Sequence, residues 1–198
     1  MTIDIKEVKR LKDLTGVGLT DAKMALEESG GDFDKALSAM RKKGLTKVEK
    51  RAEREARQGL IGSYVHDGRI GVIVEVNCET DFVARNELFV NLVKDISLHI
   101  AASNPEYVNK TQISASERNR IEEEFKDKAK ADGKSGDILD KIVSGQVDKY
   151  LSEKCLIDQP FVRNPNISVG DYVSEHAAKL GENVVIRRFS RMALGEVR

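Results

Sequence analysis

Apolar residues recur at helical spacing in the first part of the chain. Four of them lie at three-residue steps and predict one apolar helix face: Ile5, Val8, Leu11 and Leu14. Glycines interrupt the pattern after this segment and again near residue 30, and glycine favours turns. We expect Thr20 and Asp32 to cap a second and a third helix, the last ending at Gly44. Residues 4–44 therefore predict a compact three-helix bundle of ubiquitin-associated-like size.

A charged segment follows the bundle. Residues 46–58 contain three apolar side chains, spaced four apart: Val48, Ala52 and Ala56. A narrow apolar stripe among many charges predicts a solvated linker helix. Because positive charge is in excess over residues 41–57, a basic contact surface is the alternative interpretation.

The periodicity then changes from helical to alternating. Residues 60–65 and 70–78 predict two strands, joined by a turn that contains Asp67 and Gly68. In the second strand, Val72, Val74 and Val76 alternate with Ile73, Glu75 and Asn77. This pattern is typical of a strand with one buried face.

Helices dominate the rest of the chain. Helical spacing and capping residues predict helices over 86–102, 114–131, 137–153 and 168–179. In the third of these we expect an inward stripe formed by Ile138, Ile142, Tyr150 and Leu151. Segments around residues 159–161 and 164–165 read as irregular, and residues 183–193 predict a last strand, in which Val184, Ile186 and Arg188 alternate with Val185, Arg187 and Phe189.

These elements predict an α+β fold. We expect three parts: a ubiquitin-associated-like helical domain at residues 1–45, a charged linker helix at residues 46–58, and an α+β core at residues 59–198. The core should hold a three-stranded antiparallel sheet packed with helices.

Composition narrows the possible classes of protein. Lys with Arg and Asp with Glu balance at 33 each, whereas proteins that bind nucleic acid stably usually carry a basic excess. The two cysteines, Cys78 and Cys155, lie far apart and suit a reducing compartment. The first residues lack the apolar run of a signal peptide, and no apolar run reaches the ~18–20 residues that span a bilayer. We therefore expect a cytoplasmic protein with no membrane partner and no stable nucleic-acid partner.

The chain offers little for catalysis. It has no phosphate-binding loop, dinucleotide fingerprint or metalloprotease motif. Its histidines, His66, His99 and His176, lie in three different predicted elements, and no histidine and cysteine pair has zinc-site spacing. We expect no catalytic residues, no metal and no cofactor, and hence a protein that is not an enzyme.

One connection, residues 79–86, carries unusual side chains. It lies between a strand and a helix, where solvent-facing residues are the rule, yet it contains Phe82 and Val83. Phe82 either folds back into the core or serves as an aromatic anchor for a partner, flanked by the charges of Asp81 and Arg85. Aromatic anchors often dominate the energy of an interface.

Four segments carry a resemblance to a known family. Residues 75–86, EVNCETDFVARN, resemble the signature of the bacterial elongation factor Ts family. Residues 11–18, LKDLTGVG, with 21–26 and 31–32, are similar to the N-terminal module of that family, and 155–162 and 181–189 are further matches. The segments occur in the family's order and span nearly the whole chain.

The resemblance implies a guanine-nucleotide exchange factor for the GTPase elongation factor Tu. Members of the family insert an Asp-Phe pair beside the magnesium site of the partner. The resemblance therefore implies that a group of residues enters the partner at this point, here called the exchange wedge: Thr80, Asp81, Phe82 and Val83. It also implies that the N-terminal module grips the nucleotide-binding domain of the partner, with contact residues Lys12, Gly16, Val17, Gly18, Leu19 and Lys23.

The chain departs from the family pattern in two ways. Members often have two methionines where this chain has Leu19 and Thr20. Leu19 can still make an apolar contact with the partner, whereas the polar Thr20 does not replace the second methionine. Longer members carry a second core subdomain and a coiled-coil insertion, so this chain resembles the short form. Short members tend to pair as homodimers through their sheets, and the last strand lacks cysteine, so we expect non-covalent pairing.

Two other functions compete with exchange. A ubiquitin-associated-like adaptor would use residues 4–44 and leave the Asp-Phe connection idle. An RNA-binding, ribosome-associated factor would use residues 41–57 and bind with strong salt dependence.

Overall fold

The computed structural model describes residues 3–42, 51, 54–133 and 135–196. The chain divides into two compact units, Met1–Ala101 with Asp171–Arg198, and Ala102–Gly170. Helices combine with a three-stranded antiparallel sheet, which confirms the α+β class.

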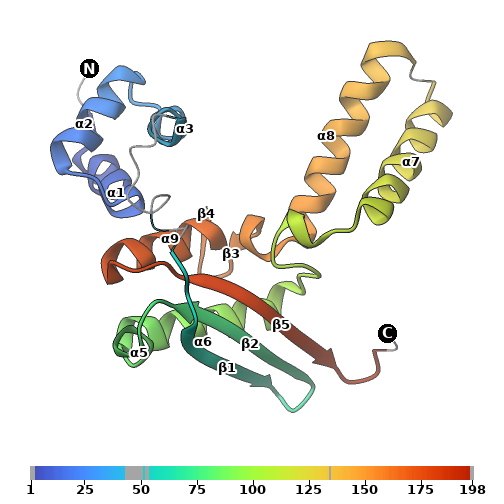
Figure 1. Ribbon diagram of the computed structural model, residues 1–198. Helices are drawn as coiled ribbons and strands as arrows, with labels where there is room; N and C mark the ends of the chain where they lie inside the picture. Colours follow the sequence, from blue (N-terminus) through green and yellow to red (C-terminus); the bar gives the residue numbers. More distant parts are fainter. Residues whose placement is uncertain (1–2, 43–50, 52–53, 134, 197–198) are drawn as a thin grey trace. The chain divides into compact units, whose positions relative to one another are not determined.

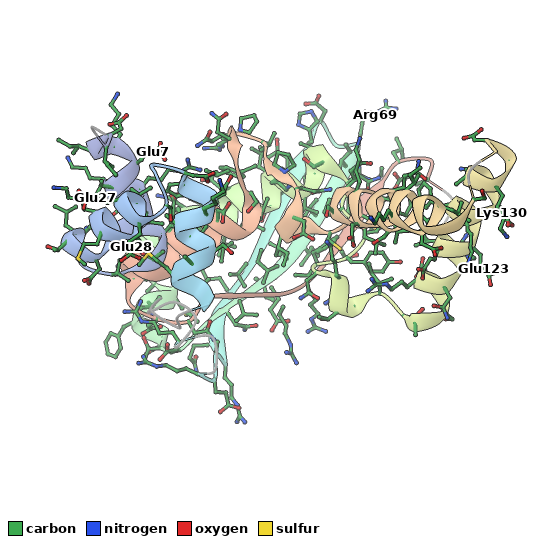
Figure 2. All side chains as sticks on the ribbon, turned by 90° about the horizontal axis from the view of Figure 1, so that it is seen from above. Glu7, Glu27, Glu28, Arg69, Glu123 and Lys130 are labelled. Carbon is green, nitrogen blue, oxygen red and sulfur yellow. The ribbon has the colours of Figure 1, made fainter. Side chains whose placement is uncertain are left out.

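Three helices form the N-terminal bundle: α1 (Ile5–Thr15), α2 (Leu19–Glu28) and α3 (Phe33–Lys42). Asp4 caps α1 by accepting a hydrogen bond from the Lys6 amide at 2.8 Å. The helices enclose a core of their own, made of Val8, Leu11, Leu14, Val17, Ala22, Leu26, Ala36, Leu37 and Met40. Charged side chains such as Glu7, Glu27 and Glu28 cover its outside (Figure 2).

Two details of the predicted bundle are wrong. Ile5 is 70% exposed, because it occupies the first position of α1, beyond the reach of the helices that bury Val8 and Leu11. Thr20 does not cap α2, since the helix already begins at Leu19 and Gly18 takes the N-cap position. The capping role of Asp32 is confirmed by its bond from the Lys35 amide at 3.0 Å.

Most of the predicted linker helix, with Gly44 before it, lies outside the described residues. Residues 55–57 have no regular structure and a strand begins at Gln58, so a helix does not continue to residue 58. The division into domains 1–45, 46–58 and 59–198 stays a prediction.

The predicted sheet is confirmed. Strands β1 (Gln58–His66), β2 (Ile70–Cys78) and β5 (Val185–Ala193) pair antiparallel in the order β1-β2-β5 (Figure 1). Asp67 and Gly68 both have positive φ, 49° and 66°, as a tight hairpin turn requires. Val72, Val74 and Val76 are buried while Ile73 is exposed, so the alternation of β2 was interpreted correctly.

A β-bulge changes the faces of the last strand. Val76 pairs with Ile186 and Glu75 pairs with Arg188, which leaves Arg187 without a partner on β2. The predicted alternation therefore holds only up to Ile186. Beyond the bulge, Arg188 faces outward, whereas Arg191 lies opposite the buried Val72 and is itself buried.

One helix, α6 (Glu87–Ser103), packs against the inner face of the sheet at close range. Its buried residues include five apolar side chains at helical spacing, Phe89, Leu92, Val93, Ile96 and Ile100. Gly62 of β1 makes this approach possible: a Cβ there would lie 2.4 Å from Val93 Cγ1 and 2.8 Å from Ser97 Oγ. The glycine is therefore required by packing, not by backbone conformation.

We expect Gly62→Ala to lower the free energy of unfolding by about 2 kcal/mol, because the added methyl overpacks the helix–sheet contact. Thermal unfolding followed by circular dichroism measures the effect. Gly71→Ala is the matched control, since a Cβ at Gly71 meets no atom within 4 Å. Equal melting temperatures for the two variants would contradict this account.

Helix α9 (Val169–Leu180) leads into β5. The Tyr172 hydroxyl donates to Asp95 of α6 at 2.6 Å, which ties α9 to the helix beneath the sheet. Gly181 follows the last residue of α9 and has a φ of 78°.

The second unit is built around a helical hairpin. Helices α7 (Ala115–Ala131) and α8 (Gly136–Lys154) run antiparallel (Figure 1), and Glu123 and Lys130 lie on the exposed side of α7 (Figure 2). In the stripe predicted for α8, Leu151 is buried as expected, but the rest of the buried face is displaced by about one position. Ile142 and Tyr150 are only half-buried, the Ile138 side chain lies outside the described residues, and the buried residues of α8 are Leu139, Val143, Val147 and Leu151.

Short elements complete this unit. They are the 3-10 turns η1 (Lys110–Gln112) and η2 (Leu156–Asp158) and the paired strands β3 (Pro160–Phe161) and β4 (Asn164–Ser168). The segments predicted to be irregular thus form a small two-stranded ladder.

Candidate functional site

The connection after β2 is a single helical turn, α5 (Asp81–Ala84). Thr80 caps it: the Thr80 Oγ1 accepts a hydrogen bond from the Val83 amide at 3.3 Å. Ala84 is buried and fixes the turn against the protein, while Val83 is half-buried. The turn is therefore anchored at one side and free at the other.

Phe82 lies on the free side of this turn. Its side chain is 83% exposed, so it does not fold back into the core. Burying such a ring would contribute about 1.5–3 kcal/mol, which the monomer leaves unused. Asp81 and Arg85 form an ion pair at 3.2 Å on the same turn, so an apolar ring stands next to charged groups of both signs.

The base of α5 is fixed by a carboxylate from a distant part of the sequence. Glu182, between α9 and β5, accepts hydrogen bonds from the amides of Glu79 and Thr80, each at 3.0 Å. The Thr80 hydroxyl donates to the second carboxylate oxygen at 2.6 Å. In return, the Asn183 amide donates to the Glu79 carboxylate at 2.6 Å.

Glu182 could not be identified as part of the site from the sequence. Residues 181–189 match the family, but nothing in that segment by itself indicates that Glu182 contacts Thr80. Residues 75–86 and 181–189 both match the family, but two segments that are distant in the sequence share no local pattern that would indicate a contact between them.

Cys78 reinforces the same turn from inside. Its thiol is fully buried and donates to the Thr80 carbonyl at 3.2 Å. Burial, with the nearby carboxylate of Glu182, raises the pKa of Cys78 to about 11, so the thiol stays protonated at neutral pH. It acts as a small buried side chain and not as a nucleophile.

The predicted contact residues of the N-terminal module divide into two groups. Gly16, Val17 and Gly18 form the turn between α1 and α2: Gly16 has a φ of 69°, Val17 is buried and Gly18 precedes α2. The others are exposed: Lys12, Leu19 and Lys23, of which the lysines pair with Asp13 and Glu27 at 3.2 and 3.6 Å. The side chains of this second group are exposed and can contact a partner.

The bundle also carries a groove, which none of these three exposed residues lines. Its volume is about 300 Å³, and it is lined by Val17, Asp21, Met24, Ala25, Glu28, Ala39 and Met40. Met24 is 52% exposed, as is Leu19. No local sequence pattern indicates that Met24 is a surface residue.

The described residues contain no cluster of three or more His, Cys, Asp or Glu side chains placed to hold a metal ion. His66 is exposed at the end of β1, whereas His99 and His176 are buried in α6 and α9. Burial lowers the pKa of His176, whose Nδ1 lies 2.8 Å from the Tyr172 carbonyl. Within the same described ranges, no helix is long and apolar enough to cross a membrane.

Comparison with known proteins gives one consistent result. Residues 44–196 match the family model described as Elongation factor TS. The chain is 49% identical over 197 residues to the elongation factor Ts of Geotalea daltonii, which covers 99% of this chain and 91% of that protein. It is 46% identical over 196 residues to the elongation factor Ts of Thermodesulfovibrio yellowstonii, covering 99% and 98% of the two chains. The similarity to these relatives includes the N-terminal bundle.

Proposed function

The chain belongs to the elongation factor Ts family of translation elongation factors, and from this premise we propose that it is the guanine-nucleotide exchange factor for elongation factor Tu. It binds the GDP-bound GTPase, disturbs the magnesium and phosphate site, releases GDP and is displaced by GTP. The observation that supports this role best is the exposed Phe82 on a firmly anchored turn.

The physical basis is the way a GTPase holds its nucleotide. The phosphates of GDP are bound by a phosphate loop and by a magnesium ion whose ligands are closely positioned. A phenyl ring inserted between helices of the partner displaces that loop and the metal ligands by roughly an ångström, which is enough to weaken phosphate binding. The Asp81 carboxylate, next to the ring, adds negative charge near the metal site.

Exchange is a linkage effect and needs no bond chemistry in this chain. If the factor weakens the affinity of the GTPase for GDP, GDP weakens the affinity for the factor by the same ratio. No nucleotide pocket, metal or cofactor of its own is required, and the protein is not an enzyme in this proposal. The exposed residues Lys12, Leu19 and Lys23 of the N-terminal module grip the nucleotide-binding domain of the partner.

The direct test is release of fluorescent GDP from purified elongation factor Tu in a stopped-flow instrument. We expect the release rate to rise with the concentration of this chain and to saturate. A release rate that does not depend on the chain would exclude the proposed function.

We also propose that two copies pair through the outer face of the sheet. Four apolar side chains are exposed there: Ile61, Val65, Ile73 and Met192. They lie on one face of the sheet. Val65 of β1 and Met192 of β5 are both paired with Gly71 of β2, and Ile73 lies two residues beyond Gly71 on the same face of β2. An exposed apolar patch of this kind is typical of a protein interface.

Under this proposal, light scattering of the wild-type chain should give about twice the monomer mass of 22.0 kDa, and Ile73→Lys should give the monomer mass. The lysine introduces a charge into the centre of the apolar contact, where it stays uncompensated. Ile5→Lys, which changes an equally exposed residue of the N-terminal bundle, is the control and should stay dimeric. A monomeric wild-type chain would remove the dimer from the proposal.

A further inference from the structure

We propose that Glu182 is the positioning residue of the exchange site, which holds α5 so that Phe82 and Asp81 face the partner in one fixed orientation. This inference rests on the proposed exchange function and names the group that makes the wedge rigid. It starts from the hydrogen bonds that join residue 182 to a turn about a hundred positions earlier in the chain.

The Thr80 hydroxyl connects Glu182 to α5. Because its proton is donated to the Glu182 carboxylate at 2.6 Å, its lone pairs are left to accept from the Val83 amide at 3.3 Å. A chain of two hydrogen bonds thus connects the Glu182 carboxylate, the Thr80 hydroxyl and the Val83 amide, and each hydrogen bond strengthens the other by polarisation. The orientation of the cap depends on the carboxylate.

The two amide bonds to Glu182 replace sheet pairing that has ended. The β1–β2 ladder stops at Cys78, so the amides of Glu79 and Thr80 have no partner strand. Glu182 supplies the acceptor for both through one oxygen. Without it, these amides turn to water and the backbone before Phe82 gains freedom to rotate.

A second set of bonds prevents the two segments from sliding past each other. The Asn183 amide donates to Glu79, and the Asn183 side-chain amide donates to the Arg54 carbonyl at 2.7 Å. Arg54 in turn lies 3.5 Å from the Glu79 carboxylate. Glu182 therefore binds the backbone of Glu79, Glu79 binds the backbone of Asn183, and Arg54 joins a third chain segment to Glu79 and Asn183.

The turn needs this support because it is short. Helix α5 has four residues, and an isolated helical turn is unstable in water. Ala84 contributes the only fully buried side chain of the turn. Packing fixes the far end of α5, and the hydrogen bonds to Glu182 fix its beginning, where Asp81 and Phe82 lie.

Stimulated GDP release tests the inference, with the folding of each variant checked by thermal unfolding. Glu182→Ala should lower kcat/KM for stimulated release by about tenfold, since a misplaced reactive group commonly costs this much or more. Thr80→Val, which removes the connecting hydroxyl, should give a similar loss. Thr80→Ser keeps the hydroxyl and should stay within about twofold of wild type.

A second comparison separates positioning from a general effect on folding. In a Phe82→Ala background, adding Glu182→Ala should lower the release rate by a smaller factor than it does in the wild-type chain, because one of the two side chains that it positions is already absent. Amide hydrogen exchange without the partner should be at least about tenfold faster at Thr80 and Val83 in Glu182→Ala, and unchanged in the centre of β2.

The outcomes distinguish the inference from the function on which it depends. A wild-type chain that leaves GDP release unchanged overturns the proposed function. An active wild-type chain with an equally active Glu182→Ala variant overturns the inference alone. The inference also fails if Glu182→Ala reduces release by the same factor with and without Phe82. If Glu182→Ala does not fold, the pair Thr80→Val and Thr80→Ser decides by the same criteria.

Discussion

Phe82→Ala is expected to lower kcat/KM for stimulated GDP release by about 10- to 30-fold while leaving the melting temperature unchanged. The ring is 83% exposed, so its removal takes no contact from the core, and exposed substitutions usually change stability by less than ~0.5 kcal/mol. An aromatic anchor buried in a partner commonly contributes about 2 kcal/mol, which corresponds to the upper end of this range. Stopped-flow release of fluorescent GDP measures the effect.

The loss should appear mainly in the maximal release rate. If the ring acts by displacing the phosphate loop, the complex still forms without it but releases GDP slowly. Leu194→Ala is the matched control, since Leu194 is 72% exposed and lies beside the hairpin end of β2, the end opposite to α5. An unchanged maximal rate in Phe82→Ala would remove the wedge from the mechanism.

Deletion of residues 1–45 should weaken the complex with elongation factor Tu by at least about 30-fold, or ~2 kcal/mol, while the rest of the chain stays folded. The bundle has its own buried core, and the sheet has another around Val74, Val76 and the residues of α6, so neither depends on the other for its apolar contacts. Titration calorimetry measures the affinity. At saturating concentration the truncated chain should still stimulate release, because α5 is intact.

A point substitution tests the same grip without deletion. Leu19→Ser should weaken the complex by about three- to tenfold, since it removes an exposed apolar side chain from the predicted contact residues of the bundle. Ile5→Ser is the control because Ile5 is also exposed and belongs to the same bundle. Undiminished affinity after the deletion would show that the bundle is not a grip.

The elements that local pattern specifies were predicted well. The hairpin around Asp67 and Gly68 depends on two adjacent residues that accept positive φ, and α6 depends on apolar residues at helical spacing. In each case the residues that determine the structure lie close together in the sequence. The exposed position of Phe82 could not be decided from composition, because a ring in a connection suits the core and an interface equally well.

The errors in β5 and α8 share a physical cause, which is that both depend on contacts between distant segments. The bulge at Arg187 is defined by its register against β2, and the buried stripe of α8 is defined by the face that α7 covers. Helix α5 is too short for periodicity, and the residues that lead into it are held by hydrogen bonds to the distant Glu182. A short stretch of sequence does not contain both segments of any of these contacts.

The topology of the sheet has a consequence for folding during synthesis on the ribosome. Strand β2 is the central strand, but its second neighbour, β5, is the last strand of the chain to be made. The nascent hairpin of β1 and β2 thus carries an open edge throughout synthesis of more than a hundred residues, and such edges invite pairing with other chains. Closing so long a loop also slows folding. The interval before β5 arrives is the period in which a chaperone would protect this chain most.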